Sequence, residues 1–458
     1  MTCNQQLRFG RTMVRRTLTL ALFAGTASLV LNAAPAAAKE KEASGAPKIT
    51  LSAKFQPVYV DFVKKLEADK ARPDVLAAQQ KVKAATDDAS QKAAEAELGA
   101  LVSAEKAQLP TVLAAATTPD DHYAAGQLEL QLGGIAMDSA MQKQALLDMI
   151  ASGKSNPADT GKFQFYIGNF AREAGDYPAA ITALQAAIAA GYTDNQIDVL
   201  LADSYLKNKQ LDKGLAALQH AIDVQKASGQ PVPVSWYRSG VVAAYNAKLV
   251  APTLSFGAGL IQEEPTTKNW SLLLEVVQRV SNYPSQDELD LMRLMARTHS
   301  FAQKEDYLEY IQAADARRLP GEVLDVINAG QASGMLSAND ASVAEAKTIA
   351  QGRVTADRAS VPSLIRDARA PGATAATASA AGDAALSYGM GADAVATYKI
   401  ALEKPGVDTQ RVLTRLGIAQ IDTGDYAGAQ ATFAKITGPR EPLAKLWSIY
   451  AAEKAAGK

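Results

Sequence analysis

Three histidines, His122, His220 and His299, are the side chains best suited to acid–base or metal chemistry, and each stands alone in the sequence. No two of them are three or four residues apart, the spacing that turns two imidazoles toward one zinc ion on a helix. His220 lies beside apolar residues in a predicted helix, so we expect a partly buried structural role. His299 is near the C-terminal end of a predicted helix, where the helix dipole favours a positive charge. The histidines therefore predict no metal site.

Two short motifs look like ligand sites until their context is considered. Residues 120–122, Asp-Asp-His, follow Pro119 and begin a predicted helix, where carboxylates cap free N–H groups. Residues 153–155, Gly-Lys-Ser, lack the glycine that a phosphate-binding loop places five residues before its Gly-Lys pair, because Asp148 stands there. We expect a helix start at the first motif and a helix end at the second.

No other pattern indicates catalysis. The sequence contains neither a G-x-S-x-G nucleophile elbow nor a glycine-rich dinucleotide loop, and its single cysteine is Cys3, near the N-terminus. Carboxylates are plentiful, but nothing in the sequence brings two of them together. We expect a non-enzymatic protein with no catalytic residues, no cofactor and no metal.

Residues 1–38 have the features of a signal peptide. Four arginines precede a mostly apolar run, Leu18–Leu31, which is too short to span a bilayer, and three alanines end the segment. We expect export to the periplasm, or secretion, after cleavage near Ala38, the alternative being an uncleaved anchor. Cleavage removes four positive charges and no negative ones, so the formal charge falls from −1 to −5. Cys3 is removed as well.

The rest of the sequence indicates helices only. Alternating strand patterns and hairpin turns are scarce, and no second apolar stretch approaches membrane-spanning length. A mildly acidic charge without long basic runs disfavours nucleic acid as a partner. The chain is also too long for one compact core. We predict an all-α protein.

One tripeptide occurs twice at a predicted helix turn. Gly-Asp-Tyr stands at residues 175–177 and again at 424–426, each time before an alanine-rich helical stretch. Glycine can adopt positive φ and end the first helix, and aspartate can cap the second. The tyrosine ring then covers the turn. Small residues such as Gly168 and Ala180 let the two helices of such a pair approach closely.

The motif belongs to a register of 34 residues that recurs along the chain. It resembles the tetratricopeptide repeat (TPR) family, with the best copies at 163–196, 197–230 and 410–439. The resemblance implies a right-handed α-solenoid of antiparallel helix pairs, preceded here by an N-terminal helical extension. The expected domains are: 1–38 signal peptide; 39–54 flexible lead-in; 55–118 N-terminal helical segment; 119–302 TPR-like pairs, with the best copies at 163–230; 303–370 degenerate pairs; 371–458 a C-terminal pair with a solvating capping helix.

In the family, the first helix of each pair lines a concave face that binds peptides. Projecting the helical stripe opposite the packing face predicts these groove residues: Phe165, Tyr166, Asn169, Arg172, Asp203, Tyr237, Arg238 and Tyr245. Tyrosine, phenylalanine and arginine are enriched at binding hot spots. Of the family's carboxylate clamp, only Asn169 and Arg238 keep suitable chemistry, which disfavours capture of a peptide C-terminus.

The sequence therefore predicts a periplasmic scaffold or adaptor that binds another envelope protein or peptide through this groove. Two alternatives remain open: a polysaccharide-export or glycan-binding scaffold, since aromatic rings can stack on sugars, and a cell-wall hydrolase. Residues 55–108 could also mediate self-association.

Overall fold

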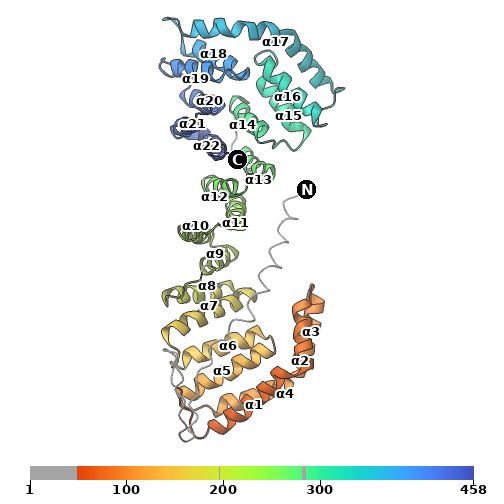
Figure 1. Cartoon of the computed structure of the whole chain (residues 1–458), viewed down its shortest axis with the longest axis vertical. Helices are drawn as coiled ribbons and strands as arrows, with labels where there is room; N and C mark the ends of the chain where they lie inside the picture. The colour runs from red at the N-terminus through yellow and green to blue at the C-terminus, as the bar shows by residue number, and fades with distance from the viewer. Residues whose placement is uncertain (1–48, 195, 281–284, 458) are drawn as a thin grey trace. The chain divides into compact units, whose positions relative to one another are not determined.

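The computed structural model describes residues 49–194, 196–280 and 285–457, and the side chains of residues 280 and 285–287 are not described. The predicted signal peptide and most of the lead-in lie outside these residues. The described chain is all-α, with 22 α-helices and no strand (Figure 1). It divides into two compact units, unit 1 up to Ala221 and unit 2 from Ile222, and the division falls within α10. No described helix is both long enough and apolar enough to cross a membrane.

Unit 1 contains the helices up to the first part of α10. Their bounds are: α1 Gln56–Ala71, α2 Pro73–Ala84, α3 Asp88–Leu101, α4 Ser103–Ala115, α5 Pro119–Ile135, α6 Ser139–Ala151, α7 Pro157–Glu173, α8 Tyr177–Ala189, α9 Ile197–Lys207 and α10 Leu211–Ala227. From α5 onward they form consecutive antiparallel pairs, α5 with α6 and α7 with α8, and each pair packs against the next. The N-terminal helical segment predicted at 55–118 consists of four helices, α1 to α4.

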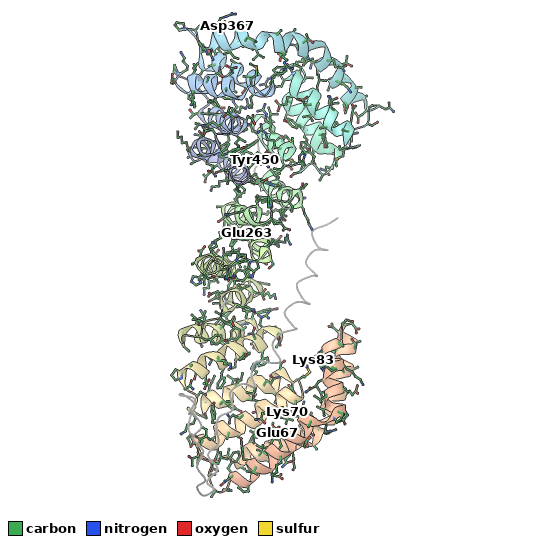
Figure 2. The ribbon with its side chains drawn as sticks, viewed as in Figure 1. Glu67, Lys70, Lys83, Glu263, Asp367 and Tyr450 are labelled. Atoms are coloured by element: carbon green, nitrogen blue, oxygen red, sulfur yellow. The ribbon has the colours of Figure 1, made fainter. Side chains whose placement is uncertain are left out.

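The N-terminal helices are well packed. Phe55, Phe62 and Leu66 around α1 are fully buried, and α1 contacts both α4 and α5. Leu98 of α3 is also fully buried, although the sequence shows only a thin apolar stripe there. Figure 2 marks Glu67 and Lys70 on α1 and Lys83 on α2, which carry charged side chains along this extension.

The repeated Gly-Asp-Tyr turn forms as predicted. Gly175 and Gly424 both have φ of 79°, in the left-handed region that glycine adopts freely. The carboxylate of Asp176 accepts a hydrogen bond from the main-chain N–H of Ala179 at 3.1 Å, so it caps α8. Asp425 caps α21 in the same way, through the N–H of Gly428 at 2.9 Å. The tripeptide is therefore a structural turn.

Glycines also set the crossing distance within a pair. A Cβ on Gly168 would lie 2.7 Å from Cγ of Leu184, and one on Gly417 would lie 2.3 Å from the ring of Phe433. These distances are shorter than van der Waals contact. The large residue of the second helix thus fills the space that glycine leaves in the first.

Both motifs that look like ligand sites are helix boundaries. Asp121 is fully buried, and its carboxylate accepts hydrogen bonds from the main-chain N–H groups of Ser52, Thr117 and Thr118. It thereby ties the segment before α1 to the start of α5. Gly153 follows the C-cap residue of α6, Ser152, and has φ of 70°, as expected of a helix end.

Unit 2 contains the rest of α10 and all the later helices. Their bounds are: α11 Val234–Asn246, α12 Val250–Glu263, α13 Thr267–Val280, α14 Ser285–Arg297, α15 Lys304–Ala314, α16 Pro320–Ala332, α17 Ala341–Ala368, α18 Ala375–Ser387, α19 Gly391–Leu402, α20 Thr409–Asp422, α21 Tyr426–Phe433, the short 3-10 helix η3 Gly438–Arg440 and α22 Glu441–Ala455. The 28-residue α17 stands between the earlier pairs and the C-terminal ones.

The last helices of unit 2 pack on its first ones. Helix α22 contacts α12, α13 and α14 as well as α21, and α20 contacts α14. The indole N–H of Trp270 in α13 donates to the carboxylate of Glu453 in α22 at 2.8 Å, across 183 residues of sequence. The sequence suggested a solvating cap at this end, but Trp447 of α22 is fully buried. The C-terminal helix therefore closes unit 2 on itself.

Candidate binding groove

The predicted aromatic residues of α7 pack among themselves. Phe165 and Tyr166 are more than nine-tenths buried, and their ring centroids lie 5.5 Å apart in an edge-to-face arrangement. Phe165 also contacts Tyr192 after α8, with centroids 5.0 Å apart. Burial raises the pKa of Tyr166, and Asp194 adds to the effect. The two rings therefore belong to the packed interior of unit 1, which corrects the prediction that they line an open groove.

Asn169 is a predicted groove residue whose side-chain amide is buried without hydrogen-bond partners among the described residues. It is only 1% exposed, and neither its amide nitrogen nor its amide oxygen has a hydrogen-bond partner within the described protein. Burying a polar amide without a partner costs about 1–3 kcal/mol. Buried polar groups without any partner are rare in folded proteins.

Arg172 lies one helical turn from Asn169 and uses only part of its hydrogen-bonding capacity. Its Nη1 approaches Oδ2 of Asp203 in α9 at 3.5 Å, while its buried Nε has no partner. Asp203 is more exposed than Arg172 and also pairs with Lys207 at 2.9 Å. We name six residues the α7–α9 face. They are Lys162, Phe165, Tyr166, Asn169 and Arg172, which follow one helical stripe of α7, and Asp203 of α9, which pairs with Arg172.

The three predicted residues in unit 2 are placed differently. Tyr237 is only 2% exposed, and its ring packs against Gly259 of α12, where an added Cβ would lie 2.1 Å away. The hydroxyl of Tyr237 is buried without a hydrogen-bond partner. This placement corrects the projection from sequence, since Tyr237 lies inside its helix pair and not on an open face.

Arg238 and Tyr245 have partners on neighbouring helices of unit 2. Arg238 is exposed, and its Nη2 lies 3.3 Å from the carboxylate of Glu264. The half-buried Tyr245 accepts a hydrogen bond from Nη1 of Arg279 at 3.3 Å. Neither residue shares a unit with Asn169.

Three recurring features define the architecture of the chain. Antiparallel pairs, glycine-to-large-residue crossings and the capped Gly-Asp-Tyr turns recur in both units. The fold is TPR-like. Neither a protein-family model nor a curated protein matches the sequence. Among solved structures, one of the TPR2AB domain of yeast Sti1 in complex with pHSP90 matches at 14% identity and a TM-score of 0.22, over 65% of this chain and 96% of that one. A TM-score this low does not establish a shared fold, so the assignment rests on the helix pairs themselves.

His220 lies in α10 of this TPR-like chain and His299 follows α14. His220 is exposed and its Nδ1 lies 3.4 Å from Asp198, which corrects the expectation that it is partly buried. His299 has φ of 53° just after α14, consistent with the predicted helix end. Among the described residues, no three histidine, cysteine or acidic side chains are grouped closely enough to hold a metal ion.

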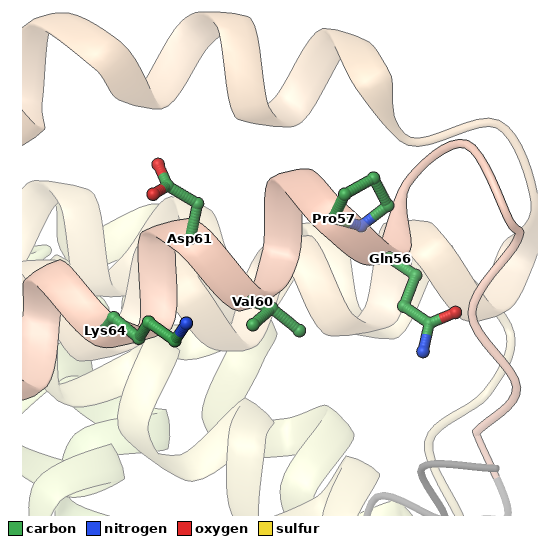
Figure 3. Close-up of a pocket in the computed structure, with 5 residues that line it drawn as sticks. All are labelled: Gln56, Pro57, Val60, Asp61 and Lys64. Atoms are coloured by element: carbon green, nitrogen blue, oxygen red, sulfur yellow. The ribbon is translucent and has the colours of Figure 1, made fainter. Parts of the chain in front are cut away.

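A hollow of about 460 Å³ lies along the first turns of α1. All its lining residues come from that one helix, as Figure 3 shows: Gln56, Pro57, Val60, Asp61 and Lys64. Asp61 is already paired with Lys65 at 3.0 Å. The hollow has no polar group from a second element, so we assign it no role.

Sequence reasoning missed a carboxyl pair between α5 and α6. Glu129 is more than nine-tenths buried, and one of its carboxyl oxygens has no hydrogen-bond partner. Burial raises the pKa of Glu129 to about 7, and the nearby carboxylate of Asp148 contributes to the shift. Gln144 donates to Asp148 at 2.9 Å, which holds that carboxylate in place. We therefore expect the stability of unit 1 to depend on pH near neutrality.

We expect Glu129→Gln to remove this sensitivity. Because the pKa of folded Glu129 lies above its ordinary value of 4.5, its contribution to stability is full below that value and is lost as pH rises through about 7. At pH 8 the free energy of unfolding of the variant should exceed that of the wild type by on the order of 2 kcal/mol. At pH 4.5 the two free energies of unfolding should be equal. Denaturant titrations at the two pH values measure this. Glu97→Gln, which removes an exposed pair with Lys81, should show no such dependence.

A second cluster that the sequence did not reveal lies in unit 2. Asp290 of α14 is fully buried and faces three arginines, with Nη1 of Arg293 at 2.9 Å, Nε of Arg415 at 3.3 Å and Nη1 of Arg440 at 3.0 Å. Arg293 also forms a two-pronged contact with Glu322, both atoms at 2.7 Å. We call these residues, together with Asp383, which pairs with Arg415 at 2.6 Å, the Asp290 cluster.

The arginines of the cluster lower the pKa values of Asp290 and Glu322. Burial alone would raise the pKa of Asp290, but the guanidiniums of Arg415, Arg293 and Arg440 outweigh it, and the net pKa lies below the ordinary value. Burial alone would also raise the pKa of Glu322, but the guanidinium of Arg293 outweighs it. The pKa of Glu322 is therefore lowered overall. The cluster therefore joins α14, α16, α18, α20 and η3 through charged contacts at neutral pH.

Proposed function

We infer that this chain is a non-enzymatic, exported scaffold that binds a segment of another protein on the α7–α9 face of unit 1. The observation that carries the proposal is the buried amide of Asn169, whose donor and acceptor both lack partners in the described protein. The main chain of an extended segment offers one N–H and one C=O per residue, which match that amide.

Arg172 and Asp203 add charge selectivity to this face. Arg172, one helical turn from Asn169, has an unused Nε, and Asp203 is the more exposed partner of its ion pair with Arg172. Because Asn169 is nearly fully buried, a bound segment has to displace a neighbouring side chain to reach it. Arg172, one turn away, is the residue that we expect to move.

The cellular location belongs to the same proposal and is supported by the sequence alone. The basic segment, short apolar run and small residues of positions 1–38 favour export, so the partner is sought among proteins of the cell envelope. A sugar-binding role is less well supported, because Phe165 and Tyr166 are buried and do not offer open ring faces for stacking.

Asn169→Leu separates binding from folding. Removing a buried amide without partners should leave the melting temperature unchanged or raise it, while capture of the partner from a cell-envelope extract by the immobilised protein should be lost. Asn246→Leu at an exposed position of α11 is the matched control and should retain capture. If Asn169→Leu lowers the melting temperature and keeps capture, Asn169 is a structural residue and the proposal is wrong.

A further inference from the structure

Unit 2 contains a cavity of about 300 Å³ next to the Asp290 cluster. Its lining residues come from α14, the turn that follows it, α15, α16 and α18, and α15 packs on both α14 and α16. The lining residues that carry the argument are Arg293, Arg297, Phe301, Tyr310, Glu322 and Asp325. No binding role has been assigned to any of them above.

Both cations in the lining already have anionic partners. The three donor nitrogens of Arg293 contact Glu322 and Asp290 at 2.7 to 2.9 Å. Arg297 makes a two-pronged contact with Asp422, at 2.5 and 3.0 Å, and lies over the ring of Trp447. Neither guanidinium is therefore available to a bound anion without breaking a pair.

Asp325 differs from Glu322, the other acid of the lining, because it has no cationic partner in the described part of the chain. Among the described residues no cation pairs with it, while Glu322, three residues earlier on the same face of α16, repels its charge. Burial and this repulsion raise the pKa of Asp325. Asp325 is exposed and Glu322 is buried, so Asp325 is the acid of the lining that solvent and ligands can reach.

Aromatic and apolar surface completes the wall. The rings of Phe301 and Tyr310 lie edge to face with centroids 6.1 Å apart, and Val326 and Leu386 add aliphatic contact. An uncompensated carboxylate beside aromatic rings attracts organic cations, because the ring faces carry partial negative charge. A volume of about 300 Å³ is at the small end for ligand pockets.

We propose that this cavity binds an alkylammonium or guanidinium group, with Asp325 as its counter-ion and Phe301 as its apolar wall. The same chemistry is offered by the lysine or arginine side chain of a protein partner and by a free small amine. The site lies in unit 2 and does not depend on the α7–α9 face, so it stands whether or not the proposed function holds.

The test is calorimetric titration of the full chain with three probes: cadaverine, agmatine and lysine blocked at both ends. At least one should bind, and Asp325→Asn should weaken that binding about tenfold or more, which corresponds to about 1.4 kcal/mol. Glu309→Gln is the matched control, because Glu309 is also an exposed acid with a raised pKa, on α15, but does not line the cavity. Tighter binding of blocked lysine identifies a protein side chain as the source, and tighter binding of cadaverine identifies a free amine.

Three results would overturn the proposal. They are the absence of heat from every probe at millimolar concentration, equal binding by Asp325→Asn and the wild type, and equal binding of the uncharged 1-pentanol and cadaverine. Asp325 is exposed, so its variant should fold normally, and the melting temperature of each variant verifies this.

Discussion

Replacing Asp290 with asparagine should lower the free energy of unfolding of unit 2 by about 3–5 kcal/mol, the range for breaking a buried ion pair from one side. Asp290 is fully buried and accepts hydrogen bonds from three arginines that are themselves nearly buried. The variant keeps the volume of the side chain but leaves the arginine charges with less compensation. Denaturant unfolding followed by hydrogen exchange of α14 and α20 measures the loss.

Asp393→Asn is the control for this experiment. Asp393 pairs with Arg369 in the same unit at 3.5 Å, but both side chains are exposed, so its loss should change stability by less than about 1 kcal/mol. Acidification should mimic Asp290→Asn. Because the pKa of Asp290 is lowered in the fold, its contribution is present above its ordinary pKa and is lost as pH falls through the folded value. Equal stabilities of Asp290→Asn and Asp393→Asn would contradict the role of the cluster.

Trp447→Ala should be comparably damaging, at about 3–5 kcal/mol. The indole of Trp447 is fully buried, and its N–H donates to the main-chain oxygen of Asp290 at 3.0 Å. Its ring lies 6.5 Å from that of Phe433 and 5.9 Å from that of Tyr450, measured between centroids. Tyr450 is marked on α22 in Figure 2. Truncation therefore removes contacts that α22 makes with α14 and α21.

Trp447→Phe separates packing from hydrogen bonding. It keeps an aromatic ring and loses the N–H donor, so a smaller loss of about 1–2 kcal/mol is expected. Hydrogen exchange should become faster in α22, α12 and α13 in the alanine variant, since α22 packs on both. Protection that decreases in α22 alone would mean that the C-terminal helix is an end cap that does not close the unit.

The local features of this chain could be predicted from its sequence because their causes are local. A glycine followed by aspartate specifies a turn and a cap within a few residues, and both copies form as expected. The same holds for Asp121 and Gly153, which end or begin helices. The 34-residue register identifies the helix pairs for the same reason.

The buried clusters could not be predicted because their members are far apart in the chain. Asp290 meets Arg415 and Arg440 across 125 and 150 residues, and no periodic pattern relates those positions. Tyr237 shows the limit of projecting a helical stripe. Its orientation depends on Gly259 of the next helix, which leaves room for the ring. Asn169 was predicted as a groove residue from the resemblance, but its lack of partners emerged only from the packing around it.

The most direct test of the proposed function is photo-crosslinking in living cells from two positions of the same helix pair. A photoreactive residue replaces Lys162 on α7, which lies two turns from Asn169 on the same face, or Thr182 on α8, which is exposed. We predict that position 162 captures one segment of one envelope protein, that position 182 does not, and that Asn169→Leu abolishes the capture. Equal capture from both positions, or capture that survives Asn169→Leu, would contradict binding on the α7–α9 face.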